Sequence, residues 1–274
     1  MAEVKRPVLC WHGGKWLLAD WVIGFFPAHE VYVEPYGGAA SVLLRKPRVH
    51  SEVYNDLDEE VVNLFRVLQG RRWPELVRAL ELTPFHRREF ELAYERTDDP
   101  IERARRLVVR SYMGFGSASH NKQRTTGFRV NTTRRGISYA GDWMHYPANL
   151  AAVVERLRGV IVECVPALDL IPKLDAPHTL FYVDPPYIHS TRSASRSEYS
   201  HEMTDSDHRV LAAVLRGLVG YVVLSGYNCQ LYEELYNGWA SFNRNVSIIR
   251  RYDRTETIWL NPRAYTAYAQ AILL

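Results

Sequence analysis

Short runs of β-branched and aromatic residues alternate with helical patterns along most of this chain, and that alternation limits the folds open to it. Buried strands are predicted by the runs at residues 30–34, 49–54, 160–165, 180–184 and 221–225. Helices are predicted between them, at residues 15–26, 41–45, 56–68, 147–157 and 205–218. Strands that alternate with helices indicate an α/β fold with a layered sheet, whose ligands bind beyond the carboxyl ends of the strands.

The alternation stops between about residues 70 and 147. Amphipathic helices are predicted there, over 73–82, 85–95 and 101–112, and a stretch rich in Gly, Ser, Thr, Asn and Arg follows at 114–142. We therefore predict a sheet domain made of residues 1–69 and 147–274, with residues 70–146 inserted as a small helical region that carries a basic loop. Between Arg103 and Gly141 the chain has nine Lys or Arg residues and no Asp or Glu, which suits a polyanionic partner.

The composition excludes several classes of protein. Hydrophobic residues make up 47% and charged residues 24% of the 274 residues, values that argue against a disordered, collagen-like or membrane-embedded chain. Cys10, Cys164 and Cys229 match no paired metal spacing, so we expect neither a disulfide framework nor a metal site. No apolar run approaches the roughly 20 residues that span a bilayer, and the first residues lack a secretory pattern. We expect a cytoplasmic protein without a membrane partner.

A glycine turn follows the first predicted strand. Residues 32–41 read Tyr-Val-Glu-Pro-Tyr-Gly-Gly-Ala-Ala-Ser, a strand that runs into a turn and then a helix, which lets a ligand approach the backbone closely. The turn is neither G-x-G-x-x-G nor G-x-x-x-x-G-K-[ST], which disfavours a dinucleotide or a nucleoside triphosphate. A tight turn with an exposed acid at Glu34 is the alternative interpretation.

Asp56 lies at the end of the second predicted strand, 22 residues after Glu34, where a carboxylate can accept hydrogen bonds from ribose hydroxyls. Together the two acids favour an adenosine moiety as part of the ligand. Asp56 also fits a helix N-cap, because a helical pattern begins just after it. Upstream, residues 11–15 form a Trp-His-Gly-Gly-Lys segment that either caps the first helix or joins the same pocket.

Asp184, Pro185, Pro186 and Tyr187 follow the buried run Phe-Tyr-Val. Prolines cannot continue a strand ladder, so the chain must turn there in a stiff conformation, with an acid and an aromatic ring at the mouth of the strand. A simple strand-ending Pro-Pro turn is the alternative interpretation of this segment.

These segments resemble the Dam-like class of S-adenosylmethionine-dependent DNA adenine-N6 methyltransferases, and the resemblance spans nearly the whole chain. In the order of that class, segment 11–15 resembles the N-terminal cofactor motif, 34–38 the methionine-binding turn, 55–56 the ribose-binding acid, and 184–187 the catalytic tetrapeptide. Asp169 resembles the acid near the adenine of the cofactor, and segments 224–228 and 256–261 match two later motifs. The class usually has Phe where this chain has Tyr36, and a third glycine where it has Ala39 and Ala40.

The resemblance implies a Rossmann-like methyltransferase sheet with helices on both faces, plus an inserted small helical target-recognition subdomain at residues 70–146. It implies S-adenosyl-L-methionine as the cofactor and double-stranded DNA as the partner of a chain expected to be monomeric. The cofactor-binding residues that it implies are Trp11, Lys15, Glu34, Pro35, Tyr36, Gly37, Gly38, Asp56, Asp169 and Asp184. The catalytic residues that it implies are Asp184, Pro185, Pro186 and Tyr187.

The chemistry of that class explains the residue types at 184–187. An exocyclic amine of a nucleobase is a poor nucleophile because its lone pair is delocalised into the ring. The Asp184 carboxylate and the Pro185 carbonyl can each accept one amine hydrogen and direct the lone pair at the methyl group. Tyr187 offers a face on which an extruded base can stack.

The basic loop mixes cations with amides, which are the groups that contact phosphates and base edges. The predicted DNA-binding residues are Asn121, Lys122, Arg124, Arg129, Arg134 and Arg135. A solvated flexible loop is the alternative interpretation. Residues 189–201 are expected to close over the extruded base, although a plain surface loop has the same composition.

Three other functions fit parts of the sequence. The chain is either an adenine methyltransferase or a methyltransferase for cytosine N4 or RNA adenine; members that act on cytosine more often have Ser at the position of Asp184, which favours adenine. An inactive DNA-binding protein is disfavoured because Glu34, Asp56, Asp169 and Asp184 are all present. A small-molecule or protein methyltransferase would not benefit from the basic loop. A single compact chain of this class also resembles phage or mobile-element enzymes, with or without a partner restriction enzyme.

Overall fold

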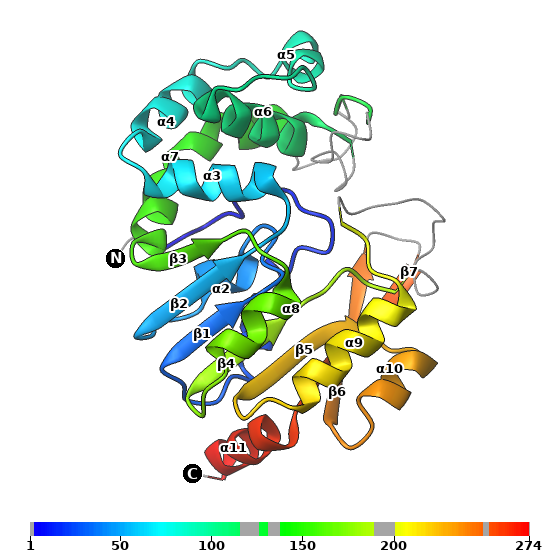
Figure 1. Ribbon diagram of the computed structural model, residues 1–274. Coiled ribbons are helices and arrows are strands. Elements are labelled where there is room, and N and C mark those ends of the chain that lie inside the picture. Colours follow the sequence, from blue (N-terminus) through cyan, green and yellow to red (C-terminus); the bar gives the residue numbers. More distant parts are fainter. Residues whose placement is uncertain (1–2, 116–125, 131–137, 189–200, 249–251, 274) are drawn as a thin grey trace.

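The computed structural model describes residues 3–115, 126–130, 138–188, 201–248 and 252–273 (Figure 1). Its centre is a seven-stranded sheet with the order β3-β2-β1-β4-β5-β7-β6. The strands are β1 (Val31–Glu34), β2 (Ser51–Asn55), β3 (Val160–Glu163), β4 (Thr179–Val183), β5 (Tyr221–Tyr227), β6 (Ala240–Ile248) and β7 (Tyr252–Leu260). The first five strands are parallel, and the β6–β7 hairpin joins them with β7 antiparallel to β5.

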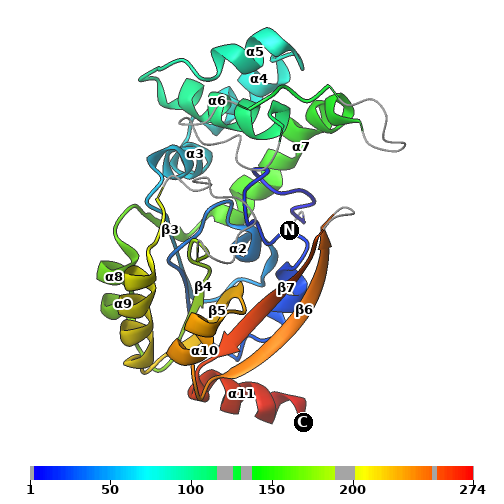
Figure 2. The ribbon, with the colours of Figure 1, turned by 90° about the vertical axis from the view of Figure 1, so that its right-hand side faces the viewer.

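Helices cover both faces of this sheet, as expected for the predicted fold class. Side chains of successive strand residues point to opposite faces, so Tyr32, Tyr54 and Tyr182 belong to one apolar cluster, while Val33 and Phe181 belong to the other. The first face packs against helices that include α1 (Ala19–Ile23), α2 (Ser41–Arg45) and α11 (Pro262–Ile272). The second packs against α8 (Ala167–Leu170), the adjoining 3-10 turn η2 (Ile171–Leu174), α9 (Asp205–Arg216) and α10 (Gln230–Leu235), of which α8 and α9 lie side by side in Figures 1 and 2.

A group of helices extends beyond the β3 edge of the sheet (Figures 1 and 2). It comprises α3 (Glu59–Gln69), α4 (Trp73–Glu81), α5 (Arg87–Leu92), α6 (Pro100–Met113) and α7 (Tyr139–Leu157). Asp58 and Asp99 begin α3 and α6 by accepting hydrogen bonds from first-turn N–H groups. The apolar side chains of these five helices belong to the same cluster as one face of the sheet. Within the described residues, the helices and this face of the sheet therefore share one hydrophobic core.

The strands and most helices lie close to their predicted positions. The first helix is shorter than the predicted 15–26, because only residues 19–23 are helical. The helix predicted to begin at Pro147 begins instead at Tyr139, so Pro147 lies inside α7. The proline indicated a helix start, but burial of Trp143 and Tyr146 stabilises the preceding turns. The hairpin strands β6 and β7 were not predicted.

Among the helices of the described ranges, none has both the length and the apolar character required to cross a membrane.

Candidate active site

The turn after β1 is shaped by close backbone approaches. A Cβ atom built on Gly37 would stand 2.1 Å from Cε2 of Tyr54, so no larger residue fits unless that ring moves. Gly38 has a φ of +47° and Ala40 a φ of +52°, both in the left-handed region. The Tyr54 hydroxyl donates to the Gly38 carbonyl at 2.7 Å. The backbone therefore bends sharply before α2, and both glycines line a cavity.

Asp56 connects this turn to the end of β2. Its carboxylate accepts the Gly38 N–H at 2.7 Å and the Asp58 N–H at 2.8 Å. Asp58, rather than Asp56, is the N-cap of α3, so the N-cap interpretation of Asp56 is wrong. Burial raises the pKa of the Asp56 carboxyl to about 6, although the two N–H donors oppose the shift.

Glu34 lies at the last position of β1 and is 3% exposed. The Tyr32 hydroxyl donates to its Oε2 at 2.7 Å, and the Leu43 N–H of α2 donates to the same oxygen at 3.1 Å. Burial raises the pKa of the Glu34 carboxyl to about 8, with the Asp184 charge adding to the rise. The acid is therefore a buried group of the turn and not the exposed residue of the alternative interpretation.

The N-terminal segment reaches the same space. Trp11 covers Gly38, because a Cβ on that glycine would meet the Trp11 Nε1 atom at 2.5 Å. Lys15 is 4% exposed, and its Nζ atom donates to the Gly13 carbonyl at 2.8 Å. Since α1 begins at Ala19 with Leu18 as its N-cap, the segment does not cap this helix. It belongs to the pocket.

The loop after β4 brings its acid to Lys15. The Lys15 Nζ atom lies 3.0 Å from Oδ1 and 2.9 Å from Oδ2 of Asp184, whose side chain is 17% exposed. Tyr187 is 4% exposed, and its ring meets that of Tyr227 edge-on at a centroid distance of 4.5 Å. Its hydroxyl donates to Glu256. Desolvation raises the pKa of the Tyr187 hydroxyl well above its ordinary value. Asp184 and Pro186 are partly exposed in this loop, whereas Pro185 and Tyr187 are buried.

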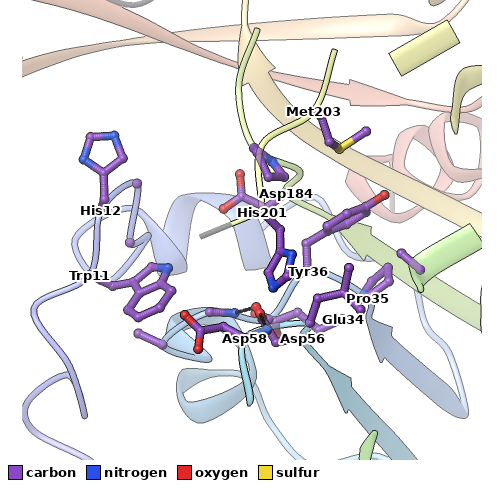
Figure 3. A pocket seen from close by; sticks show the side chains of 18 of the residues that line it. Trp11, His12, Glu34, Pro35, Tyr36, Asp56, Asp58, Asp184, His201 and Met203 are labelled. Carbon is purple, nitrogen blue, oxygen red and sulfur yellow. Dashed lines mark hydrogen bonds between the residues drawn. The ribbon is translucent and has the colours of Figure 1, made fainter. Parts of the chain in front are cut away.

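These elements enclose a cavity of about 560 Å³ at the carboxyl ends of β1, β2 and β4 (Figure 3). Among the residues that line it are ten of the predicted site residues: Trp11, Lys15, Glu34, Pro35, Tyr36, Gly37, Gly38, Asp56, Asp184 and Pro186. Acidic residues outnumber basic ones in the lining, with the carboxyl groups of Glu34, Asp56, Asp58, Asp184, Glu202 and Asp207. Figure 3 shows Tyr36 and His201 between Asp184 and Asp56.

Three of the predicted catalytic and cofactor-binding residues do not line the cavity. Asp169 is exposed on α8, while the preceding Pro166, Ala167 and Leu168 face the space. The resemblance to the methyltransferase class implied an acid near the adenine of the cofactor at this position, but the residues that line the cavity here are small or apolar. Pro185 and Tyr187 also lie outside the lining, and Tyr187 is covered by its neighbours.

Several lining residues were not predicted, namely His12, Asp58, Glu202, Met203 and Asp207. They lie inside or within six positions of the segments predicted to belong to the site, so proximity to those segments was the available signal. His201 was the last residue of the segment expected to close over a base, and it lines the cavity; residues 189–200 of that segment lie outside the described residues.

Of the predicted DNA-binding residues, only Arg129 is described. Asn121, Lys122, Arg124, Arg134 and Arg135 lie outside the described residues. The Arg129 N–H donates to the Met113 carbonyl at 2.8 Å, and its guanidinium lies 5.1 Å from the centroid of the Tyr139 ring. The base of the basic loop is therefore attached to the end of α6 and the start of α7. Across the described residues, no group of three or more His, Cys, Asp or Glu is arranged to hold a metal ion.

Comparisons with known proteins agree with this geometry. Residues 11–255 match the family model of the D12 class N6 adenine-specific DNA methyltransferases. The chain is 25% identical over 242 residues to the DNA adenine methylase of Escherichia coli K12, covering 85% of this chain and 84% of that protein. It is 25% identical over 244 residues to the DNA adenine methylase of Salmonella typhi, with the same coverage, and 22% identical over 255 residues to that of Haemophilus influenzae, covering 87% and 85%. Because the family match spans most of the chain and includes the turn after β1 and the loop after β4, this protein belongs to the D12 class N6 adenine-specific DNA methyltransferases.

Proposed function

We propose that this methyltransferase binds S-adenosyl-L-methionine in the cavity between Trp11 and Asp184 and methylates adenine N6 in double-stranded DNA. One observation carries the proposal: Asp184 opens into the same cavity as Glu34, Gly38 and Asp56, although these residues come from three different strand ends. The methyl donor and the amine that receives the methyl group can therefore meet at Asp184.

The cavity has the properties that this cofactor requires. Its volume of about 560 Å³ lies within the roughly 300–1,000 Å³ range of small-molecule sites. Glu34, with its raised pKa of about 8, is mostly neutral at pH 7. The other acidic groups of the lining favour a ligand with a sulfonium and an ammonium group, because opposite charges attract strongly where water is excluded. Asp56 lies at the end of β2, where a carboxylate accepts hydrogen bonds from ribose hydroxyls. The glycine turn admits a ligand close to the backbone.

We propose that Asp184 and the Pro185 carbonyl orient the target amine. When bound, S-adenosyl-L-methionine supplies an electrophilic methyl group. The Asp184 carboxylate accepts one amine hydrogen and the Pro185 carbonyl accepts the other, which directs the nitrogen lone pair at that methyl group. Pro186 lines the cavity and stiffens the loop. Stacking of the base on Tyr187 would require displacement of the groups that now cover its ring.

We propose that residues 70–146 recognise the DNA target. The described base of the basic loop, at Arg129, is joined to α6 and α7, which belong to the helices beyond β3. Cations at Lys122, Arg124, Arg134 and Arg135 would contact phosphates or guanine edges. A base inside a duplex cannot reach Asp184, so the adenine is expected to be extruded. We expect a monomer that works in the cytoplasm, where its DNA substrate is found.

Incubation with methyl-labelled S-adenosyl-L-methionine and unmethylated bacterial DNA, followed by digestion to nucleosides, tests the proposal. We expect label in N6-methyladenine, loss of that label in Asp184→Ala, and retention in Glu30→Ala, an exposed acid outside both the cavity and residues 70–146. The same strand is then offered as a duplex, as single-stranded DNA and as RNA, and the duplex is expected to be methylated fastest.

Other products would change the proposal in defined ways. Label in N4-methylcytosine would overturn the base assignment, and preferential labelling of RNA would overturn the duplex assignment. Equal labelling by the wild type and Asp184→Ala would remove Asp184 from its proposed role.

A further inference from the structure

Glu256 lies beside the catalytic loop, although neither the cavity lining nor the proposed site includes it. It is on β7, opposite Tyr227 of β5 and Arg244 of β6 in the strand register. Its side chain is 5% exposed. A carboxylate with so little access to water is costly unless charges and hydrogen bonds compensate for the loss of hydration.

The contacts of Glu256 reach two residues of the site. The Tyr187 hydroxyl donates to its Oε1 atom, and the Lys15 Nζ atom lies 3.6 Å from the same oxygen. The Tyr227 ring, across the strand register from Glu256, also contacts Tyr187. Glu256 and Tyr227, which are paired across β7 and β5, thus both contact the Tyr187 side chain. The Lys15 ammonium lies 4.8 Å from the centroid of the Tyr187 ring.

Lys15 therefore lies between two carboxylates with different surroundings. It is hydrogen-bonded to both oxygens of Asp184, at 2.9 and 3.0 Å, and it is 3.6 Å from the more deeply buried Glu256. When Asp184 accepts an amine hydrogen, it must share lone pairs that now face the ammonium. Because the Glu256 carboxylate is also close, the Lys15 charge remains neutralised when the ion pair between Lys15 and Asp184 weakens.

We propose that Glu256 is a positioning residue for methyl transfer, which holds the Lys15 ammonium and the Tyr187 hydroxyl so that Asp184 can accept the hydrogen of the target amine. This inference rests on the proposed role of Asp184. Without the charge of Glu256, Lys15 pairs with Asp184 alone and competes with the amine for its oxygens. Glu256 contacts neither reactant in this scheme and acts through Lys15 and Tyr187.

The variant Glu256→Gln tests the charge, because it keeps the shape and an oxygen that accepts from Tyr187. We expect the single-turnover methylation rate, at saturating cofactor and duplex DNA, to fall about 10- to 100-fold, in the range of a lost positioning interaction. The dissociation constants for S-adenosyl-L-methionine and DNA should change by less than about threefold, since the affected step follows binding. Thr257→Val, at the next buried position of β7, controls for disturbance of the strand.

The variant Glu256→Asp separates a charge effect from a packing effect. It restores the carboxylate on a shorter side chain, so we expect its rate to lie between those of the wild type and Glu256→Gln. A purely structural role predicts the opposite order, because Gln matches the shape of Glu and Asp leaves a gap. Rates are expressed per cofactor-binding site, so that a partly unfolded variant is still comparable.

Two outcomes would overturn the inference: a Glu256→Gln rate equal to that of the wild type, or a rate order in which Gln exceeds Asp. Asp184→Ala, measured in parallel, distinguishes this failure from failure of the proposed function. If Asp184→Ala is inactive while Glu256→Gln behaves as the wild type, only the role of Glu256 is lost. If Asp184→Ala remains active, the proposed role of Asp184 is lost as well.

Discussion

The hydroxyl of Ser111 forms two hydrogen bonds with the backbone of Cys10: it accepts from the N–H at 2.7 Å and donates to the carbonyl at 3.1 Å. Ser111 is fully buried in α6. The Tyr112 and Tyr146 hydroxyls donate to the Pro7 and Val8 carbonyls nearby. The N-terminal segment, which brings Trp11 and Lys15 to the cavity, is thus hydrogen-bonded to the helices beyond β3.

This attachment predicts that Ser111→Ala weakens cofactor binding from outside the cavity. The variant leaves the partly buried N–H and carbonyl of Cys10 without their side-chain partner, which should destabilise the fold by about 1–3 kcal/mol. We expect a several-fold rise in the dissociation constant for S-adenosyl-L-methionine, measured by calorimetry. Ser206→Ala, on the exposed surface of α9, is the matched control. Unchanged affinity in Ser111→Ala would show that the segment holds its position without this residue.

Gly37→Ala should damage both the fold and the cofactor site. Its new methyl group would stand 2.1 Å from the Tyr54 ring, which is buried and hydrogen-bonded to Gly38. Overpacking of this kind costs about 1–3 kcal/mol, and the displaced turn should reduce cofactor affinity. Gly217→Ala is the control, because its nearest neighbour would be 3.5 Å away and no strain is expected. Denaturant unfolding and cofactor binding measure the two effects, and wild-type values for Gly37→Ala would contradict the prediction.

The stability of the ligand-free protein should fall as the pH rises from about 6 to 8.5. The Glu34 pKa is raised from 4.5 to about 8, so between these values the folded state binds more protons than the unfolded state. Stability is then lost as the pH rises toward the folded pKa, by an amount on the order of 3 kcal/mol.

Glu34→Gln, which stays neutral and keeps an acceptor for Tyr32 and Leu43, should flatten this part of the pH profile. Urea unfolding at several pH values provides the measurement. A profile with the same slope in both proteins would show that Glu34 is not its source.

The basic loop should give DNA binding a strong dependence on salt. Each phosphate contact contributes about 0.9 to the slope of log affinity against log salt concentration. The double variant Lys122→Ser, Arg124→Ser should therefore reduce the slope by about 2 and leave cofactor binding unchanged. Lys173→Ser, an exposed lysine of η2, is the control. An unaltered slope in the double variant would place the phosphate contacts elsewhere on the protein.

Much of the fold and part of the site could be predicted because their signals are local. A few consecutive residues are enough to predict each strand, the turn at Gly37 and Gly38, and the stiff loop at Asp184. In a parallel sheet, the ends of such strands meet at one edge, so the convergence of Glu34, Asp56 and Asp184 follows from their order. The length of α7 could not be read in the same way, since burial of Trp143 and Tyr146 outweighs the proline signal.

The sequence by itself thus determined the class of sheet, the turn after β1 and the acid at the end of β4, because propensity and turn chemistry act between neighbours in the chain. Only the tertiary structure decided that Lys15 pairs with Asp184, 169 positions away, and that Ser111 holds Cys10, 101 positions away. It also placed Asp169 outside the cavity and Glu256 beside Tyr187. These relationships depend on how separate elements pack. A charged or polar group that becomes buried needs a partner to offset its lost hydration, and which partner is near is determined by the tertiary fold.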